Sequence, residues 1–125
     1  MHEEWKMEST EKYLCKYKEY SKDHLRELAA MIDNLKTYFN SLSNGVNPLQ
    51  MNDGFIHNER QGIYAIDQKG GGQKMKLQQT RLYIYPDVSS KKLFLLTIGD
   101  KHSQNKQDIP FCKEFVKDLR SQVQN

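Results

Sequence analysis

The feature that most constrains the fold is a run of apolar residues at helical spacing in the first half of the chain. In KDHLRELAAMIDNLKTYFNSLSNG, which follows Ser21, apolar side chains recur every three or four residues: Leu25, Leu28, Ile32, Leu35, Phe39 and Leu42. A stripe of this kind predicts an amphipathic helix that packs its apolar side into a core. Ser21 is a suitable N-cap, and Gly45 followed by Pro48 would end the helix. A break near Asn34 would instead give two shorter helices.

The segment before this helix, YLCKYKEY, permits two interpretations. Tyr13, Cys15 and Tyr17 alternate with other residues, which is typical of a half-buried strand, but a helix could also begin here. The first residues, MHEEWKMESTEK, are acidic and polar, whereas a signal peptide needs an apolar block. We expect one domain over residues 1–125, with residues 1–12 as a flexible N-terminal extension.

Three candidate strands follow in the second half: GFIHNERQGIYAID, QTRLYIYP and KKLFLLTIG. The polar turn PDVSS joins the second to the third, which favours an antiparallel hairpin. Nearly continuous apolar character in LFLLTI indicates a central strand covered on both sides. The segment PFCKEFVKDLRSQVQ then predicts a helix with Pro110 in its first turn. The predicted fold is α+β, a small antiparallel sheet with an N-terminal helical hairpin or long helix and a C-terminal helix.

The charge of the chain is unevenly distributed. Residues 1–59 carry seven Lys/Arg against ten Asp/Glu, residues 60–106 nine against three, and residues 107–125 three against three. The net charges are therefore −3, +6 and 0, so the middle of the chain carries the positive excess. Such a segment suits a polyanionic partner, because several cations together release counterions from a phosphate backbone; a solvated basic face is the alternative.

Two features of the basic segment are candidates for phosphate binding. The insert KGGGQKMK places Lys69, Lys74 and Lys76 around three glycines, but no helix with a Lys-Ser/Thr pair follows it as in a phosphate loop. We expect a flexible loop that could still hold a nucleic-acid backbone. Arg81 lies in the strand TRLYIY, where a fixed guanidinium could bind a phosphate bidentately; a surface salt bridge is the alternative.

Two histidines are candidates for acid–base chemistry. Lys101 and His102 follow a predicted strand end, where a rigid sheet meets an open loop, and imidazole exchanges a proton near neutral pH. By composition alone this corner is a solvated strand end. His57 stands beside Asn58, Glu59 and Arg60, and is the second candidate.

Other classes of protein find little support. No stretch approaches the roughly 18 apolar residues of a membrane span. No His, Cys, Asp or Glu spacing resembles a zinc or calcium site, so we expect no metal and no small-molecule cofactor. Cys15 and Cys112 are far apart and match no metal spacing, which favours two buried free thiols in a reducing cytoplasm.

The second half of the chain resembles bacterial toxins of the RelE/ParE type, particularly the RelE and HigB-like branches. The resemblance rests on TRLYIYPD, on KKLFLLTIG with the corner of Lys101 and His102, and on PFCKEFVKDL after it. The helical hairpin of these toxins matches Ser21 to Leu42. The resemblance implies a cytoplasmic toxin that cleaves mRNA at the ribosome without a metal, while a cognate antitoxin covers its sheet face.

Carried over to this chain, the resemblance assigns roles to individual residues. Arg81 would stabilise the phosphate, Lys101 or His102 would supply the basic residue of the corner, and Phe111 would stack on a base. Where RelE-like toxins place lysines, GIYAID has Ala65 and Asp67. This difference favours the alternative that the chain is a non-catalytic module binding nucleic acid, gyrase or a protein partner.

Overall fold

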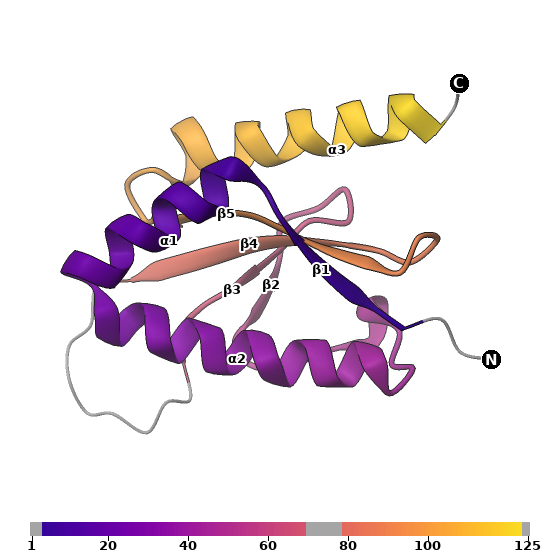
Figure 1. The fold of residues 1–125 in the computed structure, drawn as a ribbon, viewed down its shortest axis with the longest axis horizontal. Helices are drawn as coiled ribbons and strands as arrows, with labels where there is room; N and C mark the ends of the chain where they lie inside the picture. The colour runs from indigo at the N-terminus through magenta and orange to yellow at the C-terminus, as the bar shows by residue number, and fades with distance from the viewer. Residues whose placement is uncertain (1–3, 70–78, 124–125) are drawn as a thin grey trace.

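The computed structural model describes residues 4–69 and 79–123. Its main elements, in chain order, are β1 (Lys6–Ser9), α1 (Glu11–Asp23), α2 (Leu25–Ser43), β2 (Ile56–Asn58), β3 (Tyr64–Ile66), β4 (Thr80–Asp87), β5 (Lys92–Asp100) and α3 (Ile109–Val123). A short 3-10 helix (Pro48–Gln50) follows α2, and a π-helical turn (Gln104–Asp108) precedes α3. The architecture is α+β, with α3 on one face of the sheet and α2 on the other (Figure 1).

The five strands form one sheet in the order β1-β5-β4-β3-β2. The β4–β5 hairpin is antiparallel, as predicted, and so are β3–β4 and β2–β3, but β1 runs parallel to β5. The prediction of an antiparallel sheet is therefore wrong for this edge. The candidate strand GFIHNERQGIYAID is in fact two short strands, β2 and β3.

Each face of the sheet supports its own core. On one face, α1 and α2 pack with alternate strand residues, and the buried members include Leu28, Leu35, Leu82 and Ile98. On the other face, α3 packs through Cys112 and Val116 on the set Ile63, Ala65, Tyr83, Phe94 and Leu96. The central strand β5 contributes to both cores, which explains the continuous apolar run LFLLTI.

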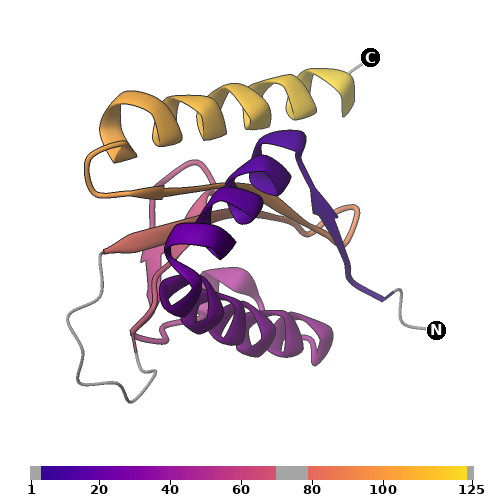
Figure 2. The same cartoon turned by 60° about the vertical axis from the view of Figure 1, so that its left-hand side comes forward.

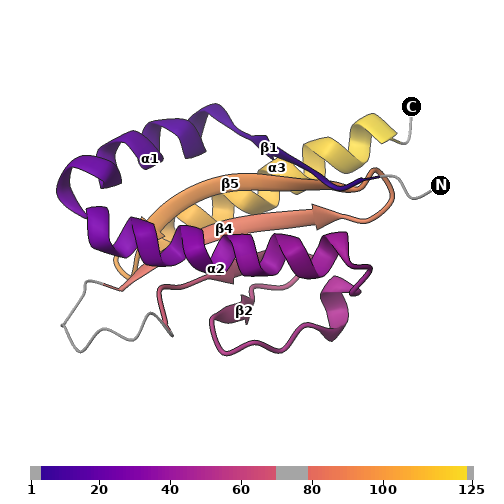
Figure 3. The same ribbon diagram turned by 60° about the horizontal axis from the view of Figure 1, so that its bottom comes forward.

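Residues 13–20 are helical, so the strand interpretation of YLCKYKEY is wrong and the helical one holds. The N-cap of α1 is Thr10, whose hydroxyl oxygen accepts from the Tyr13 N–H and donates to the Leu96 carbonyl. Figure 3 shows that α1 continues along β5 where β1 ends. Between α2 and α3, α1 thus lies along the sheet edge that β1 leaves uncovered (Figure 2).

The proposed boundaries of the long helix also need correction. Ser21 lies inside α1, where its hydroxyl donates to the Lys18 carbonyl, and the helices are separated at His24 (φ −139°, ψ 49°). No break occurs at Asn34, because α2 is continuous and the Asn34 amide donates to the Asp67 and Lys69 carbonyls. The break falls earlier because α1 follows the sheet edge while α2 crosses the face.

The start of the chain is also more regular than expected. The prediction of a flexible extension over residues 1–12 does not hold for Lys6–Ser9, which pair with residues 92–95 of β5. Nor does it hold for Glu11 and Lys12, which form the first turn of α1. At the other end of α2, Gly45 adopts a left-handed conformation (φ 88°) that ends the helix, as predicted.

Candidate functional site

Arg81 on β4 is half-buried and carries a partner. Its Nη1 lies 3.1 Å from Oε1 of Glu59, the residue that follows β2, and the Glu59 side chain is only 11% exposed. A charge-assisted contact of this kind holds the guanidinium in one place, but it also neutralises it. Arg81 is therefore a fixed cation with a carboxylate in the position that a phosphate would need.

His57 on β2 forms a second pair. Its Nε2 lies 2.6 Å from Oδ2 of Asp67, whose side chain is 10% exposed. Because a carboxylate only accepts hydrogen bonds, Nε2 is the donor in this contact and Nδ1 is the ring nitrogen left to contact a ligand. Lys69 completes the group, because its backbone N–H donates to Asp67 Oδ1 and its Nζ lies 3.8 Å from Oδ2.

The two pairs share one face of the sheet. In the strand register His57 stands opposite Ala65, and Ala65 stands opposite Tyr83. Ala65 and Tyr83 belong to the core beneath α3, and Arg81 is two residues from Tyr83, so its side chain leaves the same face. The structure thus places His57 and Arg81 on one face of the sheet, with Lys69 held beside Asp67.

A cleft of about 480 Å³ opens beside the Arg81–Glu59 pair, between the β2–β3 turn and the first half of α3. Its lining consists of Asn58, Glu59, Arg60, Asn105, Ile109, Pro110 and Lys113. Glu59 links this cleft to Arg81, while Arg60 and Lys113 supply cations to it. Arg60 and Gln61 both have positive φ, 72° and 57°, so the turn that carries Arg60 is conformationally restricted.

Sequence reasoning did not identify Asn105 or Lys113 as site residues. Neither belongs to a motif, and only the packing of α3 on the sheet carries them to the β2–β3 turn. The other charged residues of the cleft, Glu59 and Arg60, lie in the stretch HNER beside His57, which the sequence analysis did single out.

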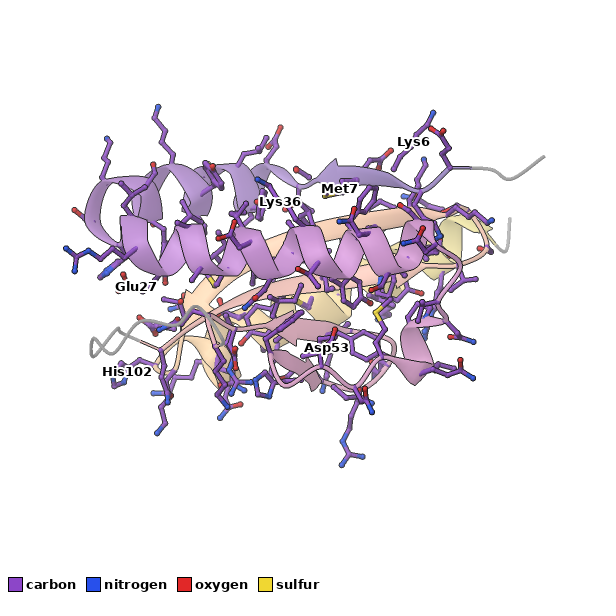
Figure 4. The ribbon with its side chains drawn as sticks, turned by 90° about the horizontal axis from the view of Figure 1, so that it is seen from below. Lys6, Met7, Glu27, Lys36, Asp53 and His102 are labelled. Carbon is purple, nitrogen blue, oxygen red and sulfur yellow. The ribbon has the colours of Figure 1, made fainter. Side chains whose placement is uncertain are left out.

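Lys101 and His102 lie in an exposed turn at the end of β5. The Asp100 carboxylate fixes this turn by accepting from the backbone N–H groups of His102 (2.8 Å) and Ser103 (3.0 Å). Because Gly99 pairs with Arg81, the corner begins beside the candidate site, but both side chains are solvent-exposed. Figure 4 shows His102 at one end of the molecule.

A buried carboxyl group supports this corner from below. Asp108 is 1% exposed and accepts from the Ser103 hydroxyl at 2.6 Å. Burial raises the pKa of Asp108, while the Ser103 hydrogen bond and nearby Lys12 and Lys16 act in the opposite direction. Burial also raises the pKa of Cys112 to about 12, so this thiol is a poor nucleophile. Cys15 on α1 is exposed, so the prediction of two buried thiols is wrong for this residue.

The remaining predicted residues lie elsewhere. Phe111 is on the other side of α3, in a separate cavity with Phe94 and Phe115, and Lys12 Nζ covers its ring at 4.4 Å from the centroid. Phe111 therefore does not line the cleft that contains Glu59. The two other loop candidates, Lys74 and Lys76, lie outside the described residues.

Within residues 4–69 and 79–123 there is no group of three His, Cys, Asp or Glu residues placed to hold a metal ion. In the same part of the chain, none of the helices has the length and apolar character needed to cross a membrane. A scan against protein-family models found no match, and neither did searches of curated proteins and of solved structures.

Proposed function

We propose that the chain is a type II toxin of the RelE/ParE kind that cleaves mRNA without a metal ion, with the cleft at the β2–β3 turn as its RNA site. The observation that carries the proposal is that a carboxylate-bound histidine and a fixed arginine leave one sheet face beside a cleft with cationic residues. The order of helical hairpin, strand hairpin, basic corner and C-terminal helix supports the same assignment.

In this mechanism the 2′-hydroxyl of RNA attacks the adjacent phosphate. Nδ1 of His57 removes the hydroxyl proton, while Asp67 stabilises the imidazolium that forms. Arg81 stabilises the charge that develops on the phosphate oxygens, and Arg60 and Lys113 hold neighbouring phosphates. The bond between phosphorus and the 5′-oxygen then breaks, which leaves a 2′,3′-cyclic phosphate, and His102 at the corner gives the departing oxygen a proton while Lys101 binds a further phosphate.

RNA binding requires a change at Glu59. A phosphate can reach the Arg81 guanidinium only when the Glu59 carboxylate moves away, and a bidentate arginine–phosphate contact offsets the loss of the ion pair. Rotation of the Glu59 side chain into the cleft, which it already lines, would be sufficient. The proposed partners are mRNA in the ribosome and a cognate antitoxin, and the proposed location is the cytoplasm.

The test is transcript-end mapping after pulsed expression of the wild-type chain, Arg81→Ala and His57→Ala. Lys18→Ala is the matched control, because Lys18 is an exposed cation on the distant helix α1. We expect new mRNA ends with the wild type and the control. In both site variants the yield of new ends should fall by about a hundredfold or more, the contribution of one acid–base or charge-stabilising group. New ends that persist in both site variants, with the proteins folded by circular dichroism, would disprove the assignment.

The second candidate is a non-catalytic module that binds nucleic acid, gyrase or a protein partner through the same face. The Arg81–Glu59 ion pair favours it, because a catalytic phosphate ligand that is already neutralised is a poor one. This alternative predicts salt-dependent binding or growth arrest without new RNA ends. Reproducible cleavage that depends on His57 would exclude it.

A further inference from the structure

The outer edge of β1 is an unpaired strand edge. The backbone N–H of Lys6 donates to the Lys91 carbonyl and that of Thr10 to Leu95, so even-numbered residues face β5. Trp5, Met7 and Ser9 therefore direct their N–H and C=O groups outward. All four residues of β1 are exposed, and the edge ends where α1 begins. An exposed edge of this kind can pair with another strand.

The charges along this edge are unbalanced within one copy. Lys6 stands opposite Lys92 in the β1–β5 register, a like-charge neighbour that is unfavourable. Lys92 instead contacts Glu8, with Nζ 3.1 Å from Oε1. In the described residues Lys6 has no ion pair of its own, and Figure 4 shows its side chain pointing away from the body of the protein.

A cavity of about 480 Å³ adjoins the same strand on the α3 side of the sheet. Three aromatic rings, those of Phe94, Phe111 and Phe115, form its apolar part. Glu8, Glu11 and Lys12 supply the charged groups at its rim, two carboxylates against one ammonium. An aromatic surface with an excess of carboxylate suits a long basic side chain, whose methylene groups pack on rings while its cation meets the acid.

We propose that two copies of this chain associate through β1, antiparallel and centred on Met7, so that the two sheets become continuous. This register places Lys6 of each copy opposite Glu8 of the other, on the side of the sheet that carries α3. Each Lys6 then reaches the partner's aromatic cavity, and Glu8 lies between two cations, Lys92 of its own chain and the partner's Lys6. Trp5 pairs with the partner's Ser9 on either side of Met7, which completes a short antiparallel ladder.

The sequence KMES is self-complementary only in this arrangement. A shift of one residue would place Lys6 opposite Met7 or Ser9, neither of which carries a charge, and a shift of two would place Lys6 opposite Lys6 or Glu8 opposite Glu8. Charge therefore selects the register centred on Met7. The interface is isologous, because each copy contributes the same strand and the same cavity. Dimerisation through β1 is independent of the proposed function, since neither Arg81 nor His57 takes part.

Sedimentation velocity over a range of concentrations tests the proposal with two complementary charge reversals, Lys6→Glu and Glu8→Lys. Each variant alone places like charges opposite each other at both symmetry-related positions, and we expect its dimerisation to weaken about tenfold relative to the wild type. In a mixture of the two variants, the heterodimer joins a chain with carboxylates at positions 6 and 8 to a chain with ammonium groups at both. Position 6 of each chain then faces an opposite charge at position 8 of the other, so the affinity of the heterodimer should recover. Lys18→Glu, a charge reversal on α1 away from this edge, should leave dimerisation unchanged.

The double variant Lys6→Glu with Glu8→Lys gives the sharper restoration, because it exchanges the two charges and recreates both opposite-charge pairs in a homodimer. Its recovery of near wild-type dimerisation is the decisive result, since an unrelated peptide bound at the same edge would not produce it. A wild-type chain that sediments as a monomer at every concentration would overturn the proposal. So would a dimer that Lys6→Glu does not weaken. Met7→Pro gives an independent check: it removes an outward N–H without removing a hydrogen bond to β5, and it should abolish dimerisation.

Discussion

Replacement of Gly99 by alanine tests how tightly the corner beside the candidate site is built. Gly99 lies in β5 opposite Arg81, and the buried Asp108 side chain covers it. A Cβ on this residue would overlap Asp108 Oδ2 and lie 2.6 Å from Asp108 Cγ and 2.7 Å from Ser103 Oγ. The carboxyl group must therefore move, and its hydrogen bond with Ser103 must break.

The expected cost is the sum of two effects. Forcing a methyl group into a filled site costs about 1–3 kcal/mol. Loss of a buried hydrogen bond to a carboxyl group costs about 1.5–3 kcal/mol more. We therefore expect Gly99→Ala to lower the free energy of unfolding by about 2.5–6 kcal/mol. For a domain of this size, that corresponds to a fall in Tm of about 10–25 °C.

Urea and thermal unfolding measure this change, with Gly54→Ala as the matched control. The control has free space around its added Cβ, so its unfolding free energy should change by less than about 1 kcal/mol. Adding Asp108→Ala to Gly99→Ala removes the overlapping atoms, and the double variant should be more stable than the summed single effects by about 1–3 kcal/mol. A Gly99→Ala protein as stable as the control, or strictly additive effects, would refute the reasoning.

Three further predictions concern the same region. Because burial raises the pKa of Asp108, the folded state holds this proton more tightly than the unfolded state, and stability is lost as pH rises through the raised pKa. Asp108→Asn should therefore have a higher free energy of unfolding than the wild type at neutral pH. Urea titrations should show this difference shrinking as the pH falls toward the usual pKa of aspartate, and a difference independent of pH would contradict the prediction. The hydroxyl of Tyr83 is buried with no hydrogen-bond partner in the described residues, so Tyr83→Phe should be neutral or stabilising by up to about 1 kcal/mol in urea unfolding, and a loss of stability would contradict this. If the proposed function holds, Glu59→Gln should bind single-stranded RNA several-fold more tightly in fluorescence anisotropy, because Arg81 is released, and the effect should vanish in an Arg81→Ala background.

Several elements could be predicted from local sequence because their patterns record which side chains are buried. The helical spacing of Leu28, Leu35 and Leu42 identified the buried side of α2, although Met31 and Tyr38 are buried as well. The polar turn PDVSS identified the β4–β5 hairpin, and Pro110 marked the first turn of α3. In each case the signal lies within a few residues of the chain.

The candidate site could be predicted only in part. Arg81, His57 and Lys69 were named from their residue types, but their partners were not. Glu59 is 22 positions from Arg81 and Asp67 is ten from His57, and no local pattern relates such residues. In the sequence, Asp67 argued against a nuclease because it stands where RelE-like toxins place a lysine. In the structure, its carboxylate contacts His57 and holds the imidazole in place.

Local spacing was sufficient to predict the amphipathic helix α2, the β4–β5 hairpin and the terminal helix α3. The side chains that each of these elements buries recur at regular intervals among neighbouring residues of the sequence. Tertiary packing was needed to make Lys6–Ser9 a strand, because KMES has no apolar alternation and pairs through its backbone with β5. In α1, Tyr13, Tyr17 and Tyr20 stand at helical spacing while Tyr13, Cys15 and Tyr17 alternate as in a strand, so the local pattern permitted both and the structure is helical. The cleft at the β2–β3 turn arises last, from the packing of α3 over a sheet whose strands bring distant charges together.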